Sequence, residues 1–219
     1  MSLRDVPLQL VYEGRGSELL SEFVVPCLQQ ATRYDRVASW FTVRSLVAIG
    51  AGIEDLWRRH GQMRLVIGIH DVPPQLAAAA SRDIALSREV ERLRALLLTE
   101  ITGLRDELSR NTVATIAWML QDGLLQVRIA AVRGADSQQA VFHPKRFIFV
   151  YEVGDVVTAD GSPNETVMGL GENIEALTVL RSWDNEAYTS LHQRIFEELW
   201  EGKRPYAQVR ELDAAFAEE

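Results

Sequence analysis

The sequence predicts an α/β fold in which helices flank a central mixed β-sheet. Short runs of β-forming residues alternate with amphipathic helical segments along the 219-residue chain. One run, Phe147–Tyr151, is apolar at every position, which is typical of a strand buried on both faces at the centre of a sheet. The composition, with 47% hydrophobic and 25% charged residues, is that of a single soluble globular domain.

The first half of the chain alternates expected strands with expected helices. Ser17 and Thr42 are suitable N-cap residues, because their hydroxyls can accept a hydrogen bond from the first helical turn. Gly61 ends the second of these helices, and Pro73 and Pro74 stop the strand that follows. The expected strands are residues 8–12, 36–41 and 63–70, and the expected helices are residues 18–32, 42–59, 75–110 and 113–121.

The second half is richer in strands, which are expected at residues 124–132, 141–151, 156–159 and 175–183. A turn around Gly154 joins the middle pair, and residues 160–166 form a loop. An amphipathic helix over residues 185–200 closes the fold. We therefore expect one domain over residues 1–204, followed by a polar tail or linker over 205–219.

Charge and cysteine content narrow the possible functions. A net charge of −8 argues against a surface devoted to non-specific nucleic-acid binding, although a local cluster of cations could still bind a nucleic-acid substrate. The single cysteine, Cys27, cannot form an internal disulfide, and its apolar neighbours indicate helix core. The apolar runs are too short to span a bilayer and no signal peptide opens the chain, so we expect a cytoplasmic protein without membrane contact.

Polar residues suited to phosphate chemistry gather in the second half. His143 and Lys145 are two positions apart on an expected strand, so their side chains share one face. The next hairpin brings Gly161-Ser162-Pro163-Asn164 beside them. Cleavage of a phosphodiester needs a nucleophile and groups that bind the non-bridging oxygens. The imidazole supplies the first, and the ammonium, hydroxyl and carboxamide supply the second.

The order His143-x-Lys145 and then Gly161-Ser162-x-Asn164 resembles the signature of the phospholipase D superfamily. Asn173-Ile174-Glu175 resembles the segment that begins the next strand in the superfamily's small bacterial nucleases. Ser39-Trp40-Phe41 is similar to a stretch in nuclease domains attached to bacterial helicases and restriction enzymes. The resemblance implies a phospholipase-D-like α/β/α sandwich.

The same resemblance implies a role for each residue of the motif. His143 would be the nucleophile, and Glu175 would hold the tautomer of its imidazole. Lys145 and Asn164 would bind the phosphate, with Ser162 as an auxiliary donor. The family mechanism uses two His-Lys sets, whereas this chain has one His-x-Lys, so the resemblance also implies a homodimer. It implies no metal ion and no other cofactor.

One departure from the family pattern bears on activity. Val150 occupies the position of the motif's Asp, five residues after Lys145, and the hairpin before Gly161 is longer than usual. Members that resemble restriction nucleases lack this Asp, so the departure points toward that branch and away from lipid-hydrolysing enzymes.

The resulting hypothesis is a metal-independent phosphodiesterase that cleaves DNA through a phosphohistidine in a homodimeric active site. It would be the N-terminal domain of a restriction or helicase protein. The alternative is a catalytically weak module that dimerises or binds nucleic acid for a helicase or another ATPase domain or subunit. A lipid phosphodiesterase is third, because no membrane-facing amphipathic or basic surface is evident.

Structural roles are the simpler interpretation of several other polar and aromatic residues. Trp40 and Phe41 could stack on a base, but aromatic residues at a strand end are more often core. His60 and His192 have charged neighbours on helical stretches, which indicates solvated side chains. His70, before Asp71, is expected to be structural.

Overall fold

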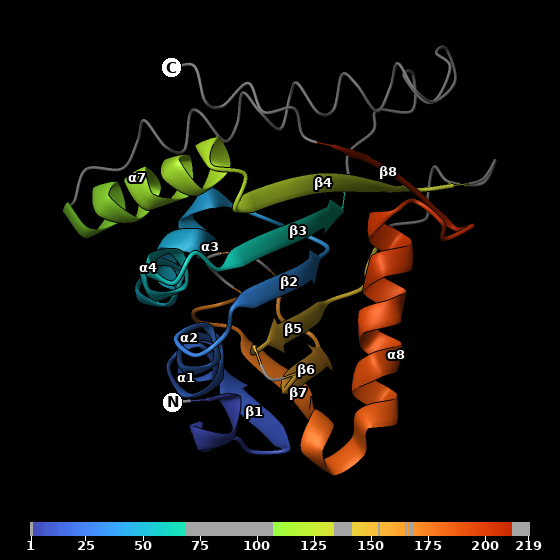
Figure 1. Ribbon diagram of the computed structural model, residues 1–219, viewed down its shortest axis with the longest axis horizontal. Coiled ribbons are helices and arrows are strands. Elements are labelled where there is room, and N and C mark those ends of the chain that lie inside the picture. Colours follow the sequence, from blue (N-terminus) through green and yellow to red (C-terminus); the bar gives the residue numbers. More distant parts are fainter. Residues whose placement is uncertain are drawn as a thin grey trace.

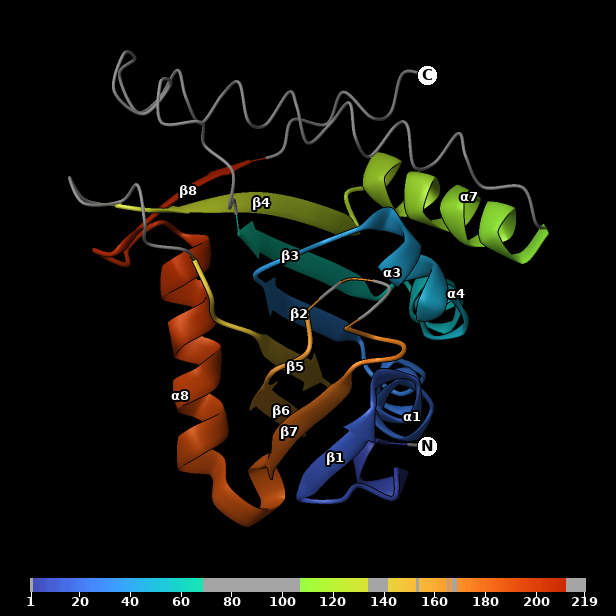
Figure 2. The same cartoon turned by 180° about the vertical axis from the view of Figure 1, so that it is seen from behind.

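The computed structural model describes residues 2–68, 107–133, 142–152, 154–164, 166 and 169–211. In this part of the chain eight strands form one mixed sheet, in the order β1-β7-β6-β5-β2-β3-β4-β8 (Figures 1 and 2). The strands are β1 (Val11–Arg15), β2 (Arg33–Ala38), β3 (Gln62–Gly68), β4 (Leu125–Val132), β5 (Arg146–Val150), β6 (Val156–Gly161), β7 (Ile174–Arg181) and β8 (Ala207–Glu211).

The sheet has a parallel block of three strands, and the strands on either side of it pair antiparallel. β2, β3 and β4 run parallel, as strands joined by helical crossovers do. β5 pairs antiparallel with β2, and the antiparallel pairing continues through β6 and β7 to β1. As a result, the sheet end where β2 and β6 finish is also the end where β5 and β7 begin.

Most helices lie on one face of the sheet and a single long helix lies on the other (Figure 1). A short 3-10 turn, η1 (Leu3–Asp5), precedes β1. The first face carries α1 (Gly16–Leu19), the π-helical turn η2 (Leu20–Val24), α2 (Val25–Leu28), α3 (Val43–Ala48), α4 (Gly50–Arg58) and α7 (Glu107–Gln121). The second face carries α8 (Ser182–Trp200). None of the helices in the described ranges is long and apolar enough to cross a membrane.

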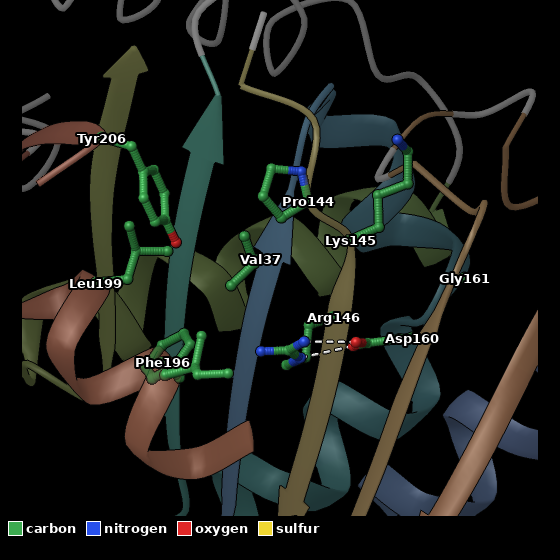
Figure 3. Close-up of a pocket in the computed structure, with 10 residues that line it drawn as sticks. Val37, Pro144, Lys145, Arg146, Asp160, Gly161, Phe196, Leu199 and Tyr206 are labelled. Atoms are coloured by element: carbon green, nitrogen blue, oxygen red, sulfur yellow. Dashed lines mark hydrogen bonds and ion pairs between the residues drawn. The ribbon is translucent and has the colours of Figure 1, made fainter. Parts of the chain in front are cut away.

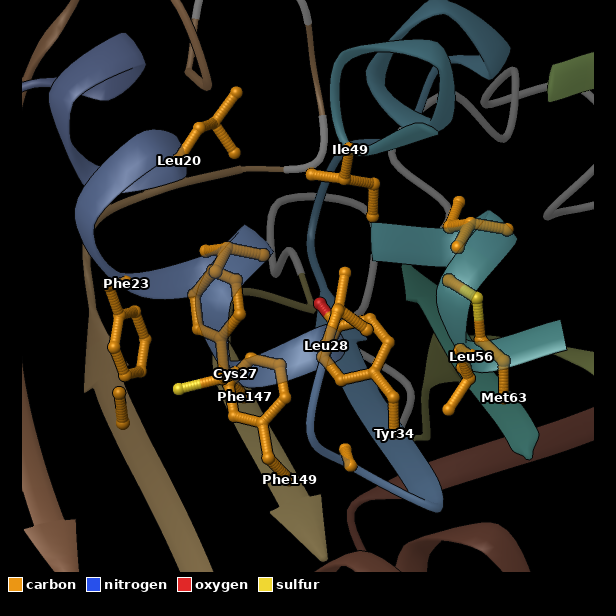
Figure 4. Close-up of a cluster of buried hydrophobic side chains, with 14 of the residues drawn as sticks. Leu20, Phe23, Cys27, Leu28, Tyr34, Ile49, Leu56, Met63, Phe147 and Phe149 are labelled. Atoms are coloured by element: carbon orange, nitrogen blue, oxygen red, sulfur yellow. The ribbon is translucent and has the colours of Figure 1, made fainter. Parts of the chain in front are cut away.

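The first face holds the larger apolar core, built around a group of aromatic rings (Figure 4). Tyr34 of β2 stacks on Phe149 of β5 with ring centroids 4.9 Å apart. Phe23 of η2 packs edge-on against Phe149 at 5.5 Å and against Phe147 at 6.1 Å. Each buried aromatic side chain removes a large apolar area from water and stabilises the fold by about 1.5–3 kcal/mol.

The second face has a smaller apolar cluster, and ion pairs attach its helix, α8, to the sheet. Arg64 of β3 donates to both oxygens of the buried Asp35 of β2, at 2.7 and 2.8 Å, and to both oxygens of Glu197 on α8, at 2.7 and 3.0 Å. The guanidinium also lies over the rings of Phe196 and Trp200. This network ties α8 to the two central strands.

The predicted fold class is confirmed, with corrections to three elements and to one residue. The first helical segment ends at Leu28 instead of residue 32, because β2 begins at Arg33. β5 begins at Arg146 instead of residue 141, so His143 and Lys145 lie in the segment that leads into the strand. His192 is half-buried instead of solvated, because it faces Thr158 of β6. Residues 75–106 of the expected long helix and His70 lie outside the described residues.

The third corrected element is the expected tail over residues 205–219. Ala207–Glu211 form β8, which pairs antiparallel with β4 and completes the sheet. The segment resembles a linker in composition because an edge strand is half exposed and keeps polar side chains, here Gln208, Arg210 and Glu211. Residues 212–219 lie outside the described part.

Candidate active site

The site residues lie where the apolar rows of three strands end. Tyr34 of β2, Phe147 and Phe149 of β5, and Leu177 and Val179 of β7 all belong to the larger core. Side chains alternate along a strand, so the next positions of these rows at the same sheet end are charged residues. They are Arg36 on β2, Lys145 before β5 and Glu175 on β7. The candidate site is therefore the polar end of the larger core.

His143 and Lys145 contact each other directly. The Lys145 Nζ atom lies 3.0 Å from Nε2 and 3.2 Å from Nδ1 of His143, and it donates to the His143 carbonyl oxygen at 3.2 Å. His143 is exposed, whereas Lys145 is only 7% exposed. An ammonium group can only donate and a neutral imidazole has a single acceptor nitrogen, so at most one of the two ring contacts is a hydrogen bond.

The surroundings of Lys145 weaken its hold on its proton. Burial lowers the pKa of Lys145, and the positive charge of Arg36 lowers it further, while Glu175 acts in the opposite direction. Desolvation disfavours the charged amine, and a nearby cation disfavours it again. An anion beside the Lys145 ammonium group would relieve both effects.

Ser162 and Asn173 hold the carboxylate of Glu175 in place. The Ser162 hydroxyl donates to Oε2 of Glu175, and the Asn173 carboxamide donates to Oε1 at 3.2 Å. Ser162 is itself fixed on β7, because its Oγ accepts from the Ala176 N–H at 3.0 Å and its N–H donates to the Ala176 carbonyl at 3.0 Å. Each oxygen of the Glu175 carboxylate thus accepts a hydrogen bond from a neighbouring side chain.

This arrangement differs from the roles that the motif implied. Within the described residues the Glu175 carboxylate bonds to Ser162 and Asn173, and no hydrogen bond joins it to His143. The only hydroxyl proton of Ser162 is directed to Glu175 and not toward the position of a phosphate. In this structure Ser162 orients Glu175, and Glu175 acts on Lys145 through charge.

Gly161 is required by the close approach of β6 to β7. A Cβ atom at this position would lie 2.0 Å from the Ala176 carbonyl oxygen, a separation that no side chain can occupy. The glycine therefore lets the Ser162 hydroxyl reach the Ala176 N–H.

Asn164 is oriented by the segment that follows β2. The Trp40 backbone N–H donates to its Oδ1 at 3.3 Å. Since the amide oxygen accepts this bond, the amide nitrogen keeps both of its protons for other acceptors. Asn164 is thereby set to donate, which is what a ligand for a phosphate oxygen must do.

Arg36 is a site residue that the sequence analysis missed. Its side chain is 1% exposed, lies 3.6 Å from the ring centroid of Phe147, and donates to the Pro163 carbonyl at 2.8 Å and the Val37 carbonyl at 2.7 Å. A weaker bond to the Arg146 carbonyl, at 3.3 Å, links it to the start of β5. Arg36 therefore connects the loop that carries Asn164 to the strand that follows Lys145. No pattern in the sequence marks Arg36, because it follows the charged Asp35 and its role depends on which strands become neighbours across the sheet.

The overall structure resembles solved proteins of the phospholipase D family. NucT from Helicobacter pylori superposes with a TM-score of 0.51 and 11% identity, over 87% of this chain and 94% of its own. A phosphatidylserine synthase from Haemophilus influenzae superposes with a TM-score of 0.52 and 14% identity, over 96% of this chain but 40% of its own. Both are members of that family.

The chain has the phospholipase D fold.

Nuc from Salmonella typhimurium, described as a phospholipase D family member, gives a TM-score of 0.47 at 17% identity, over 92% of this chain and 96% of its own. The sequence itself matches no family model and no curated protein. Such low identities leave the phospholipase D fold visible in the coordinates and in the short motif, but not in overall sequence similarity.

A shallow pocket of about 240 Å³ lies next to the site in this phospholipase D fold, toward α8 (Figure 3). Pro144 and Tyr206 line it, and at its floor Arg146 pairs with Asp160 at 2.6 Å. Lys145 also lines the pocket, and its amine points away from that ion pair. Among the described residues, no group of three or more His, Cys, Asp and Glu side chains is placed to hold a metal ion.

Proposed function

We propose that this protein is a metal-independent phosphodiesterase that cleaves DNA, with His143 as the nucleophile. One observation carries the proposal. An exposed imidazole lies within 3.2 Å of a buried ammonium group, at the polar end of the core of a phospholipase D fold. The imidazole can form a bond to phosphorus, and the ammonium can bind a non-bridging oxygen.

Binding of a phosphodiester would change the partner of Lys145. The phosphate oxygens are stronger acceptors than a neutral imidazole, so Nζ would donate to them and release the ring nitrogen. Asn164 would donate its amide protons to the same phosphate. Arg36 and Glu175 would not touch the substrate; they position Asn164 and adjust the charge of Lys145.

The reaction would proceed in two displacements. In the first, a ring nitrogen of His143 forms a bond to phosphorus, the bond from phosphorus to the leaving oxygen breaks, and a second acid protonates that oxygen. In the second, water attacks the phosphohistidine and gives its proton to the same group, which frees His143. One imidazole cannot serve as nucleophile and acid in the same step.

The second acid would be His143 of another copy of the chain. Of the other histidines that the structure describes, His192 lies on α8 against β6 and His60 follows α4, so neither shares the site with His143. A two-fold axis beside the exposed His143 would place one imidazole on each side of a phosphate. The functional unit of this proposal is therefore a homodimer.

The test is hydrolysis of DNA and of bis-(p-nitrophenyl) phosphate in EDTA, over the range of about pH 5 to 8 in which histidine titrates. We expect activity in the purified dimer and a loss of more than about 10³-fold in His143→Ala, as when a nucleophile is removed. His60→Ala, at an exposed histidine, is the matched control and should keep full activity. An inactive wild-type dimer, or full activity in His143→Ala, would contradict the proposal.

A second candidate function is a nucleic-acid-binding or dimerisation module with little turnover. Val150 favours it, because the motif's Asp is replaced by a residue that packs on the apolar cluster under α8. This function predicts that His143→Ala binds DNA and supports its biological role as the wild type does. The nuclease proposal predicts that binding survives but the biological role is lost.

The proposed context is a restriction or helicase protein with this chain at its N-terminal end. The Ser39-Trp40-Phe41 stretch and the missing Asp at Val150 support that branch of the family. An ATPase domain or subunit that co-purifies with the native protein would be the expected result. Purification of the native protein with no ATPase in the same chain or complex would remove this part of the proposal.

A further inference from the structure

Trp40 lies next to the candidate site. Its backbone N–H bonds to Asn164 at 3.3 Å, which places it against the proposed phosphate ligand. The preceding residue, Ser39, is fully buried and donates to the Pro144 carbonyl at 3.4 Å, inside the His143-Pro144-Lys145 segment. Trp40 is thus in contact with one half of the motif and one residue away from a contact with the other half.

The indole faces outward from this position. Trp40 is 45% exposed, although its neighbours Ser39 and Phe41 turn toward the protein interior. Trp40 lies in a bend just after Ala38, the last residue of β2, between the buried Ser39 and the partly buried Phe41. The sequence analysis favoured a core role for Trp40 and Phe41; that prediction holds for Phe41 and is wrong for Trp40.

An exposed tryptophan beside a phosphate site has a specific chemical use. A nucleobase presents a flat π-face that stacks on an aromatic side chain, and each such contact contributes about 1–3 kcal/mol whatever the base. In a duplex both faces of a base are already covered by its neighbours, so only an unpaired base can stack on an indole. The charge of the chain, −8, offers little general attraction for the backbone, which makes a stacking contact more important for substrate binding.

We infer that Trp40 forms a stacking subsite for an unpaired nucleobase next to the scissile phosphate, and that single-stranded nucleic acid is the preferred substrate. The inference rests on the proposed phosphodiesterase function and names its substrate class. Asn164 links the two parts, because the residue that binds the phosphate is held by the backbone of the residue that binds the base. The base and the phosphate of one nucleotide would then be bound together.

The experiment removes the base and the indole separately. The substrate is a single-stranded oligonucleotide with one phosphodiester in a methylphosphonate backbone. A second version has abasic sugars on both sides of that phosphodiester. Removal of the bases should lower the kcat/KM of the wild type by about 5- to 150-fold and that of Trp40→Ala by less than about 2-fold. Trp40→Phe, which keeps an aromatic ring, should respond to base removal nearly as the wild type does.

The backbone N–H of Trp40 remains in Trp40→Ala, so its bond to Asn164 is preserved and the side chain alone is tested. Equal losses on base removal in the wild type and Trp40→Ala would overturn the inference, because the base would then be recognised elsewhere. A duplex cleaved as fast as the single strand would also overturn it. If the proposed function itself fails, the wild type cleaves neither oligonucleotide or His143→Ala cleaves both, and these results differ from every outcome that concerns Trp40 alone.

Discussion

The two faces of the sheet are held together by different forces. The face under α1–α4 and α7 buries a continuous apolar core with a cluster of aromatic rings. The face under α8 has a smaller apolar cluster and relies on the Asp35–Arg64–Glu197 network and the Arg146–Asp160 pair. Apolar burial is non-directional and tolerant, whereas a buried ion network depends on each partner.

The difference explains where the candidate site lies. On the larger face the apolar rows of β2, β5 and β7 end in Arg36, Lys145 and Glu175, and these charges are not all neutralised by one another: Arg36 lowers the pKa of Lys145 while Glu175 raises it. On the α8 face Arg64 and Arg146 each donate to a carboxylate. The first arrangement leaves room for an anionic ligand, and the second is complete without one.

The largest expected effect comes from breaking the network on the α8 face. Arg64→Met removes the two bonds from this guanidinium to the buried Asp35 and leaves that carboxylate with the single bond from Arg33 at 3.1 Å, so we expect the free energy of unfolding to fall by about 3 kcal/mol. Urea denaturation would measure the change. Arg58→Met is the matched control: that guanidinium is 63% exposed in its ion pair with Glu54, so its loss should cost at most about 1 kcal/mol. Equal effects of the two substitutions would show that the Asp35–Arg64–Glu197 network does not stabilise the packing of α8 on the sheet.

Loss of Lys145, the cation at the end of the larger core, is expected to lower activity and leave stability unchanged, the opposite of the result for Arg64. Lys145→Met should lower kcat/KM by about 10²–10³-fold, as the loss of a preorganised transition-state donor does, without lowering the free energy of unfolding. The reason is that methionine removes a desolvated charge from the end of an apolar row. Lys203→Met, at a lysine whose side chain is 67% exposed, should change neither quantity. A destabilised Lys145→Met would make Lys145 a structural residue like Arg64.

Arg36 allows charge and geometry to be separated. The alkaline limb of the pH profile should fall below the ordinary lysine range, because Lys145 must be protonated and its pKa is lowered. Arg36→Gln removes the positive charge that opposes protonation, so the limb should move to higher pH. Arg36→Lys keeps the charge and should leave the limb in place, but it loses the planar group that bonds to the Pro163 and Val37 carbonyls. Its kcat should fall by about 10- to 100-fold, because Asn164 is displaced. Identical limbs in the two variants would exclude an electrostatic role for Arg36.

The smallest expected effect concerns His192 on the α8 face. Burial lowers the pKa of His192, Arg146 lowers it further, and Asp160 raises it. The unfolded chain therefore binds this proton first as the pH falls. The neutral His192 side chain therefore makes its full contribution to stability above the ordinary histidine pKa of 6.5, and this contribution is lost as the pH drops below that value. His192→Gln can still bond to Thr158, and its free energy of unfolding should vary less between pH 7 and 5 than that of the wild type. A steeper dependence in the variant would reverse the assigned sign.

The sequence was informative where one period or one motif dominates. The apolar run of β5 and the order of His143, Lys145, Ser162, Asn164 and Glu175 can be found without coordinates. The predicted N-caps were less accurate, because α1 is capped by Arg15 instead of Ser17 and the Thr42 side chain makes no capping bond. β8 could not, because the polar side chains of an edge strand have the composition of a linker. Arg36 and the bond from Ser162 to Glu175 could not either, since they depend on which strands become neighbours across the sheet.

The covalent intermediate gives the most direct test of the central claim. The dimer is mixed with bis-(p-nitrophenyl) phosphate, quenched under alkaline conditions within the first turnover, digested and mapped by mass spectrometry. The account predicts a p-nitrophenyl phosphate adduct on His143, on one chain of each pair, and none in His143→Ala. Turnover without an adduct on His143, or an adduct on another residue, would contradict it.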